Sequence, residues 1–128
     1  MTRKESPALS ELHTAVAGMM DYLKSAMPVP HERRKHARIQ FNYPIVVFTA
    51  DGVALQSVTR DVSLNGMRIL GSRSLAGQKI RVVIPHADNK VRPWNFVLQV
   101  LWSAPMGDGL FDSGGMFLGL VDEAEAAG

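Results

Sequence analysis

Two short polar stretches hold the residues whose types and spacing could do chemistry. The first is basic and runs from His31 to Arg38, and the second, from Asp61 to Gly66, is a turn that also holds a serine. An arginine offers a planar pair of N–H donors to a phosphate or to the O6/N7 edge of guanine. A carboxylate accepts hydrogen bonds from the N1 and N2 edge of guanine, and a serine hydroxyl serves phosphate or base. Together the two stretches favour an anionic, guanine-containing ligand.

The spacing within these stretches matches a known pair of motifs. The matching residues read Arg34-x-x-x-Arg38 and Asp61-x-Ser63-x-x-Gly66. This pair resembles the signature of PilZ domains, which are bacterial receptors for the second messenger cyclic di-GMP. The resemblance covers roughly residues 32–122, including a segment at 117–121 that is similar to the last strand of the family. Either motif alone is short, whereas both motifs in this order are considerably more specific.

The resemblance implies a role for each matched residue. Arg34 and Arg38 would fold over the ligand from an arm ahead of the first strand, while the second motif would hold one guanine and its phosphate. Arg33 stands immediately before the first motif, and in relatives an arginine there accompanies an intercalated pair of cyclic di-GMP molecules. A further guanidinium can neutralise and stack on the added phosphates and bases. We therefore expect a ligand pair, bound by Arg33, Arg34, Arg38, Asp61, Ser63 and Gly66.

Both stretches and their neighbours also have ordinary structural interpretations. A basic run is most often solvated, and the segment 61–66 alone would be an Asx-type turn bonded to local backbone. Arg60 and Arg68 flank this turn and could reach a phosphate, but we rank them below the motif residues. Trp94 and Trp102 lie an even number of positions apart on one expected strand. Without an intervening bulge both would point to one face, and we expect them to pack in the barrel rather than stack on bases.

Length and composition bound the class of protein. The 128 residues suffice for one domain with a modest core, and 46% hydrophobic with 20% charged residues is ordinary for a globular protein. A formal net charge of +2 argues against a polycation that binds a nucleic-acid polymer. The absence of cysteine fits a reducing compartment. The sequence shows no membrane span and no signal-peptide core, so we expect a cytoplasmic protein.

The chain divides into three parts. We expect residues 1–30 to form a helix and a proline-rich hinge, residues 31–122 a β-rich domain, and residues 123–128 a polar tail. The first part carries apolar residues with the 3-4 spacing of one helix face, at Leu9, Leu12, Val16, Met19, Leu23 and Ala26. This stripe either packs on the domain that follows or joins protomers into a homo-oligomer, and both alternatives stay open here.

Six strands are expected in the β-rich domain, at 39–49, 54–60, 67–70, 79–84, 93–103 and 116–121. Pro44 implies an edge position or a bulge in the first strand, and Asp51-Gly52 marks a hairpin. Residues 107–115 form a glycine-rich connector to which we assign no function. Six strands with short connections predict a mainly β protein, an antiparallel barrel preceded by an N-terminal α-helix, which agrees with the PilZ fold.

The resemblance implies a binding module and not an enzyme. We expect a cyclic di-GMP effector that changes conformation on binding and signals to an unknown protein partner in motility, secretion or exopolysaccharide output. The alternative is a ligand-independent PilZ-type adaptor that acts by protein contacts. A nucleic-acid binder would need a broader basic surface than 14 basic against 12 acidic residues provide. We expect no catalytic residue and no metal site, because no catalytic motif or metal-ligand spacing is visible.

Overall fold

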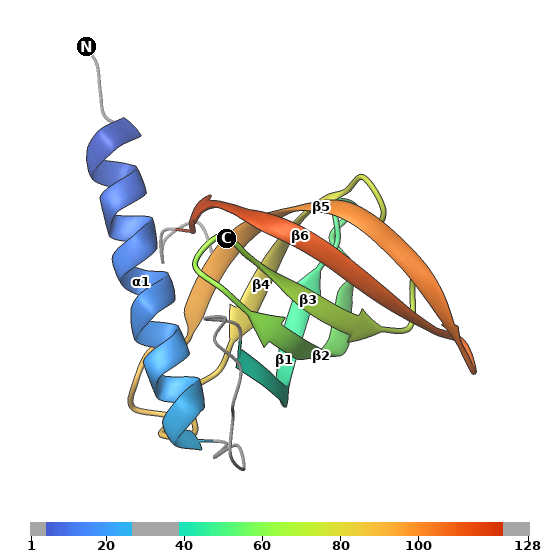
Figure 1. The fold of residues 1–128 in the computed structure, drawn as a ribbon, viewed down its shortest axis with the longest axis horizontal. Helices are drawn as coiled ribbons and strands as arrows, with labels where there is room; N and C mark the ends of the chain where they lie inside the picture. Colours follow the sequence, from blue (N-terminus) through green and yellow to red (C-terminus); the bar gives the residue numbers. More distant parts are fainter. Residues whose placement is uncertain (1–4, 27–38, 122–128) are drawn as a thin grey trace.

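A computed structural model describes residues 5–26 and 39–121 of the chain (Figure 1). One helix precedes six strands, and the elements are α1 (Glu5–Ala26), β1 (Ile39–Phe48), β2 (Ala54–Val62), β3 (Gly66–Gly71), β4 (Lys79–Ile84), β5 (Trp94–Gly107) and β6 (Leu110–Leu120). All pairings are antiparallel, and the strands close into a barrel in the order β1-β2-β3-β6-β5-β4. The expected six-stranded barrel with an N-terminal helix is confirmed.

The barrel interior is built from alternate residues of each strand. In β4, Ile80, Val82 and Ile84 are buried, while Arg81 and Val83 between them lie on the outer face and are half-buried. This alternation follows from the pleat, which points successive side chains to opposite faces of a sheet. The same pattern in β5 buries Phe96, Leu98 and Val100. Branched aliphatic and aromatic side chains at every second position therefore fill the barrel.

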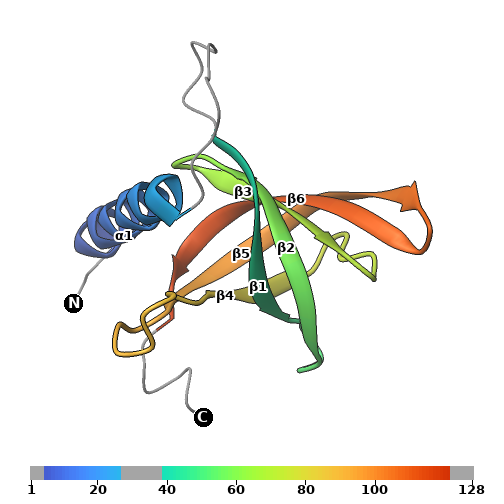
Figure 2. The same cartoon turned by 90° about the horizontal axis from the view of Figure 1, so that it is seen from below.

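Helix α1 lies beside the barrel, next to β6 and β1 (Figures 1 and 2). Its buried face carries four residues of the predicted stripe, each at most 3% exposed, namely Leu12, Val16, Met19 and Leu23. These side chains belong to the same hydrophobic core as the barrel residues. The stripe thus packs within the chain, and pairing of protomers through α1 stays a prediction. In the part of the chain that the structure describes, no helix is both long and apolar enough to cross a membrane.

A chain of hydrogen bonds joins α1 to the barrel. The Tyr43 hydroxyl donates to the carbonyl of Pro85 at 2.7 Å and lies 2.9 Å from the Tyr22 hydroxyl. Because Tyr43 uses its proton on Pro85, Tyr22 donates to Tyr43 and in turn accepts from the Ala87 N–H at 2.9 Å. The Tyr22 ring also stacks on His86, with 4.1 Å between ring centroids. Burial, together with the hydrogen bond to Tyr22, raises the pKa of Tyr43 above its ordinary value. The helix is therefore held by directional bonds as well as by apolar packing.

The β5–β6 hairpin corrects the prediction for residues 107–115. Strand β5 continues to Gly107 and β6 begins at Leu110, so this segment is the tip of a long hairpin with the first half of β6, and not a connector. Asp108 and Gly109 form its two-residue loop, with φ values of 59° and 76°. Two positive φ angles are those of a type I′ turn, which Asp-Gly favours. The signal was present in the sequence, as it was at residues 51–52.

The first strand carries the irregularity that its proline predicts. The pairing of β1 with β2 shifts register between Gln40 and Tyr43, just before Pro44. On its other side, β1 pairs with β4 only from Val46 to Phe48. Pro44 therefore lies where no second ladder needs its missing N–H. The strand therefore has the irregularity expected at Pro44, with a register shift just before it and no β4 partner at that residue.

Candidate functional site

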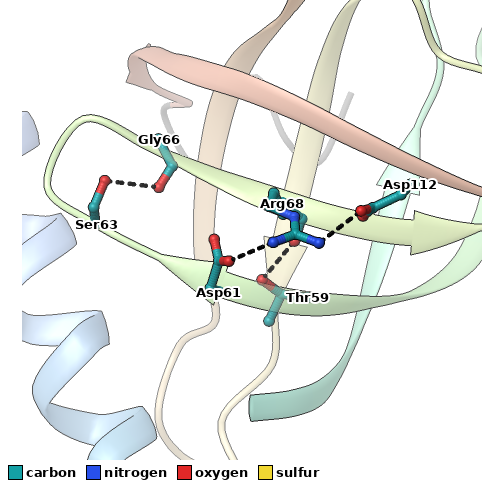
Figure 3. A network of polar contacts seen from close by, with 6 residues as sticks. All are labelled: Thr59, Asp61, Ser63, Gly66, Arg68 and Asp112. Atoms are coloured by element: carbon teal, nitrogen blue, oxygen red, sulfur yellow. Dashed lines mark hydrogen bonds and ion pairs between the residues drawn. The ribbon is translucent and has the colours of Figure 1, made fainter. Parts of the chain in front are cut away.

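The second predicted motif lies at the connection between β2 and β3. Asp61 stands near the end of β2, Ser63 lies in the turn, and Gly66 begins β3 (Figure 3). The arginines of the first motif, Arg34 and Arg38, lie outside the described residues, as does Arg33. The described part of the site is therefore its barrel side, and the arginine arm stays a prediction.

Ser63 is held in place by the turn, but only weakly through its hydroxyl. Its backbone N–H donates to the carbonyl of Gly66 at 2.9 Å, which closes the turn. The Ser63 Oγ accepts from the Asn65 N–H at 3.4 Å and donates to the Gly66 carbonyl at 3.5 Å (Figure 3). Both distances are long for hydrogen bonds of this type. A ligand oxygen at ordinary distance would therefore compete well for this hydroxyl.

Gly66 is required by the close approach of two strands. A Cβ at this position would overlap the backbone carbonyl oxygen of Gly115 on β6. The φ angle of Gly66 is not among the positive values of the structure, so a special turn conformation is not the reason for glycine. The Phe117 N–H donates to the carbonyl of Asn65 at 2.9 Å and fastens the turn to β6 at the same place. The motif glycine thus sets how closely the turn sits on β6.

An ion-pair network holds the carboxylate of Asp61. Arg68 on β3 donates through Nη1 to Asp61 Oδ2 at 3.1 Å and through Nη2 to Asp112 Oδ2 at 2.7 Å (Figure 3). Both carboxylate side chains are only 6% exposed. Thr59 Oγ1 donates to the backbone carbonyl of Arg68 at 3.1 Å, which fixes the strand beneath the guanidinium. The hydrogen bond to Asp112 raises the pKa of Arg68 above its usual value. We assign Arg68 to positioning Asp61 and not to binding phosphate.

The network contains two acidic side chains and one basic one. Asp61 and Asp112 both pair with Arg68, and Asp112 Oδ1 is buried with no hydrogen-bond partner among the described residues. A buried cluster with surplus acceptors attracts a group that brings N–H donors. The N1–H and N2–H₂ edge of guanine is such a group. The carboxylate acceptors of the described residues therefore suit the base that the motif predicts.

A hollow of about 300 Å³ opens beside this network and is called the ligand hollow. Asp61, Ser63 and Gly66 line one side of it, and Leu101, Trp102 and Met116 are among the residues that line the other. The structure thus brings the three described motif residues to one cavity. The opposite wall comes from β5 and β6, two strands to which the sequence assigned no site residue.

Trp102 corrects the prediction that both tryptophans pack in the barrel. The pairing of β5 with β6 shifts register between Val100 and Trp102, and Trp102 is 43% exposed in the wall of the ligand hollow. A Cβ added to Gly114 would come within 2.5 Å of the indole ring, so the missing side chain makes room for it. Trp94 packs partly buried against the core, as expected. The bulge sends the two indoles to different environments.

Sequence reasoning missed Asp112 and the wall at residues 114–115. Asp112 lies 44 positions after Arg68, and no local pattern links them. Two signals were available for the wall. The Asp108-Gly109 turn brings residue 102 near 114 and 115 once the hairpin is drawn, and a register shift then pairs it with Gly114. Adjacent glycines in a strand mark a close approach of other groups.

Comparisons with known proteins bear on the family and the fold. The model of the PilZ domain family matches residues 32–126, which include both motifs. No curated protein gave a match. Among solved structures, the Bacillus subtilis inhibitor of motility (MotI/DgrA) is similar with a TM-score of 0.50 and 13% identity, over 79% of this chain and 52% of that chain. This chain therefore spans about half the length of that protein, and the likeness concerns the fold alone. Because the family model covers most of its length, the chain belongs to the PilZ domain family of cyclic di-GMP receptors.

Proposed function

We propose that this protein is a receptor for cyclic di-GMP that changes conformation on binding and signals to a protein partner. The observation that carries the proposal is the convergence of three chemical groups on the ligand hollow. These are the carboxylate of Asp61, the weakly bonded hydroxyl of Ser63 and the exposed indole of Trp102. They suit, in that order, the hydrogen-bonding edge of guanine, a phosphate oxygen and the face of a base.

The size of the ligand hollow supports a role for the arginine arm. At about 300 Å³ it lies at the lower end of ordinary ligand pockets. It suits one guanine and its phosphate, so most of a cyclic dinucleotide would remain outside. We propose that Arg33, Arg34 and Arg38 fold over this outer part and bind a second, intercalated molecule. Their charge-assisted hydrogen bonds would offset the entropy lost when the arm is ordered.

The signal would arise from the position of this arm. A ligand that binds one arm position more tightly shifts the population toward it and changes the surface offered to a partner. Motility is one output that we propose, in line with the role of MotI as an inhibitor of motility, and secretion and exopolysaccharide synthesis are the others. PilZ domains are binding and adaptor modules, and this role requires no catalysis. An intracellular messenger as ligand implies a cytoplasmic location.

Isothermal titration of cyclic di-GMP into the purified protein tests the proposal. We expect saturable binding of about two nucleotides per chain, weakened at least tenfold by Arg34→Ala, since a hydrogen bond between charged groups contributes about 1.5–3 kcal/mol. Lys35→Ala is the matched control, because it removes the same charge from the same stretch outside the motif, and we expect a smaller effect. One nucleotide per chain would keep the receptor and overturn the ligand pair. No binding at all would favour the ligand-independent adaptor.

A further inference from the structure

A second hollow, of about 560 Å³, is not lined by Asp61, Ser63 or Gly66 and is called the outer hollow. Strands β1, β4 and β5 lie side by side there (Figure 2). Val46 and Val83 line it from the outer face, since they alternate with buried residues of β1 and β4. Leu120, at the end of β6, adds an exposed apolar side chain. The outer hollow is therefore an apolar depression on the outside of the barrel.

Two arginines line the outer hollow, the exposed Arg92 and the half-buried Arg81, and the second is held among apolar side chains. Arg81 on β4 is the direct cross-strand partner of Phe48 on β1, and its guanidinium carbon lies 4.1 Å from the centroid of the Phe48 ring. Its Nη1 donates to Asn95 Oδ1 on β5 at 3.2 Å. A ring face and an amide are both neutral partners. Among the described residues, no carboxylate forms an ion pair with Arg81.

This arrangement prepares Arg81 for an anion. Stacking on the ring and the bond to Asn95 limit the rotamers of the side chain, so less entropy is lost when the guanidinium binds. Only one N–H group is used by Asn95, which leaves donors for a bidentate carboxylate. Half-buried arginines with aromatic neighbours are typical of residues that dominate binding energy at protein interfaces.

We propose that the outer hollow is the docking site for the protein partner and that it takes an acidic segment with aliphatic neighbours. A glutamate or aspartate of the partner would pair with Arg81, and adjacent aliphatic side chains would cover Val46, Val83 and Leu120. The charge selects a carboxylate, and the apolar lining selects its neighbours. This proposal rests on the proposed function in one respect, which is that the receptor has a protein partner. Docking of that partner requires no nucleotide.

The two hollows are separate, so that both can be filled at once. Each uses β5 and β6, but at different ends. The ligand hollow takes Trp102 and Met116, whereas the outer hollow takes Asn95 and Leu120. A partner in the outer hollow would therefore leave the nucleotide site open. The receptor would hold its partner by one surface and sense the nucleotide by another.

A peptide titration followed by NMR on the full chain tests the proposal. The probe is the capped peptide Ala-Leu-Glu-Leu-Ala, and the control probe has glutamine in place of glutamate. We expect the glutamate peptide to shift the signals of Val46, Val83 and the Asn95 side chain, with saturation in the millimolar range. Arg81→Gln should weaken this binding at least tenfold, and Arg81→Lys should weaken it less because the charge remains. Lys79→Gln, an exposed cation on the same strand, should change it less than twofold.

Each other outcome overturns the proposal in a distinct way. Equal shifts with both peptides would show that the carboxylate is not recognised, and an unchanged affinity in Arg81→Gln would show that Arg81 is not its partner. No shifts at these residues would remove the site. Concentration-dependent shifts without peptide would show that a second copy of the chain fills the hollow. Titrations of cyclic di-GMP distinguish the two proposals, because Arg81→Gln should bind the nucleotide normally and Arg34→Ala should still bind the peptide.

Discussion

Arg68 and Arg81 are both partly buried strand residues, yet their surroundings give them opposite uses. Arg68, in the wall of the ligand hollow, donates to the buried carboxylates of Asp61 and Asp112. Arg81, in the outer hollow, is held by the ring of Phe48 and the amide of Asn95. The first guanidinium pairs with two buried carboxylates. The second forms an ion pair with none among the described residues.

The comparison shows how the partners of a charged side chain decide its role. Carboxylates that fix a guanidinium also use its charge, so Arg68 serves as an internal brace for Asp61. Neutral partners fix a guanidinium without using its charge, so Arg81 keeps its attraction for an anion from outside. A guanidinium can be held in one orientation without having its charge neutralised. Only neutralisation of the charge makes an arginine unavailable to an anion from outside.

The most direct test of this difference is to remove the charge of each arginine in turn. Arg68→Gln removes the guanidinium that pairs with two buried carboxylates, and we expect it to lower the free energy of unfolding by about 3 kcal/mol or more. Arg81→Gln loses a ring contact and one hydrogen bond, and we expect a loss of about 1 kcal/mol. Urea denaturation of the two variants and the unsubstituted protein measures the difference. Equal losses would mean that the two arginines have the same structural role.

A matched pair of aspartates serves as the control for this experiment. Asp112→Asn removes one of the two carboxylates while Asp61 still pairs with Arg68, so the loss should be intermediate, about 1–2 kcal/mol. Asp108→Asn makes the same change in the exposed hairpin loop, where asparagine tolerates the positive φ, and should change stability by less than about 0.5 kcal/mol.

A second prediction tests whether the Trp102 indole, in the wall of the ligand hollow, contacts the ligand. Gly114→Ala places a methyl group 2.5 Å from the Trp102 ring, so the indole must move, and we expect the affinity for cyclic di-GMP to fall about tenfold. Gly119→Ala lies on the same strand with nothing within 4 Å of its Cβ and should have no such effect. Titration followed by Trp102 fluorescence, in a Trp94→Phe background, gives the affinity. Unchanged binding in Gly114→Ala would mean that the indole does not contact the ligand.

The smallest expected effect on stability concerns Tyr43. Its ring contacts Tyr22, which also contacts Trp94 at the border of the outer hollow. The pKa of Tyr43 is raised in the folded state, so its neutral form is favoured there. The stability that this contributes is fully present below about pH 10, the unfolded value, and is lost as the pH rises toward the folded pKa. Tyr43→Phe should therefore make the free energy of unfolding fall less steeply above pH 10, by under about 1 kcal/mol per pH unit. Identical slopes in alkaline denaturation would contradict this.

The fold followed from local signals. Alternating apolar residues, turn dipeptides and the helical stripe each act over a few positions, and they agree with the barrel that the family resemblance implies. Leu12 and Leu23 are buried as their spacing predicts. The prediction was wrong where the local signal was set aside, at Asp108-Gly109, and where a bulge intervened, at Trp102. A bulge inverts the face of every later residue in a strand, so spacing alone does not reveal it.

The candidate site was predictable only in part, because its chemistry depends on pairs distant in sequence. The motif gave Asp61, but its brace Arg68 is itself held by Asp112 on another strand. The outer hollow has the same property, since Arg81 meets Phe48 only through the register of β1 with β4. Such partners are set by strand order and register. These partners can be identified only when the strand order and register are known.

The docked helix has a consequence for how the molecule folds. The family match begins at residue 32, yet Val16, Met19 and Leu23 of α1 lie in one continuous core with the barrel. Side chains that share a core gain and lose their packing together, so α1 and the barrel should melt in a single cooperative transition. Cutting the chain at the family boundary would expose the barrel surface that α1 covers. The segment that matches the family model therefore lacks helix α1, which belongs to the same folding unit as the barrel.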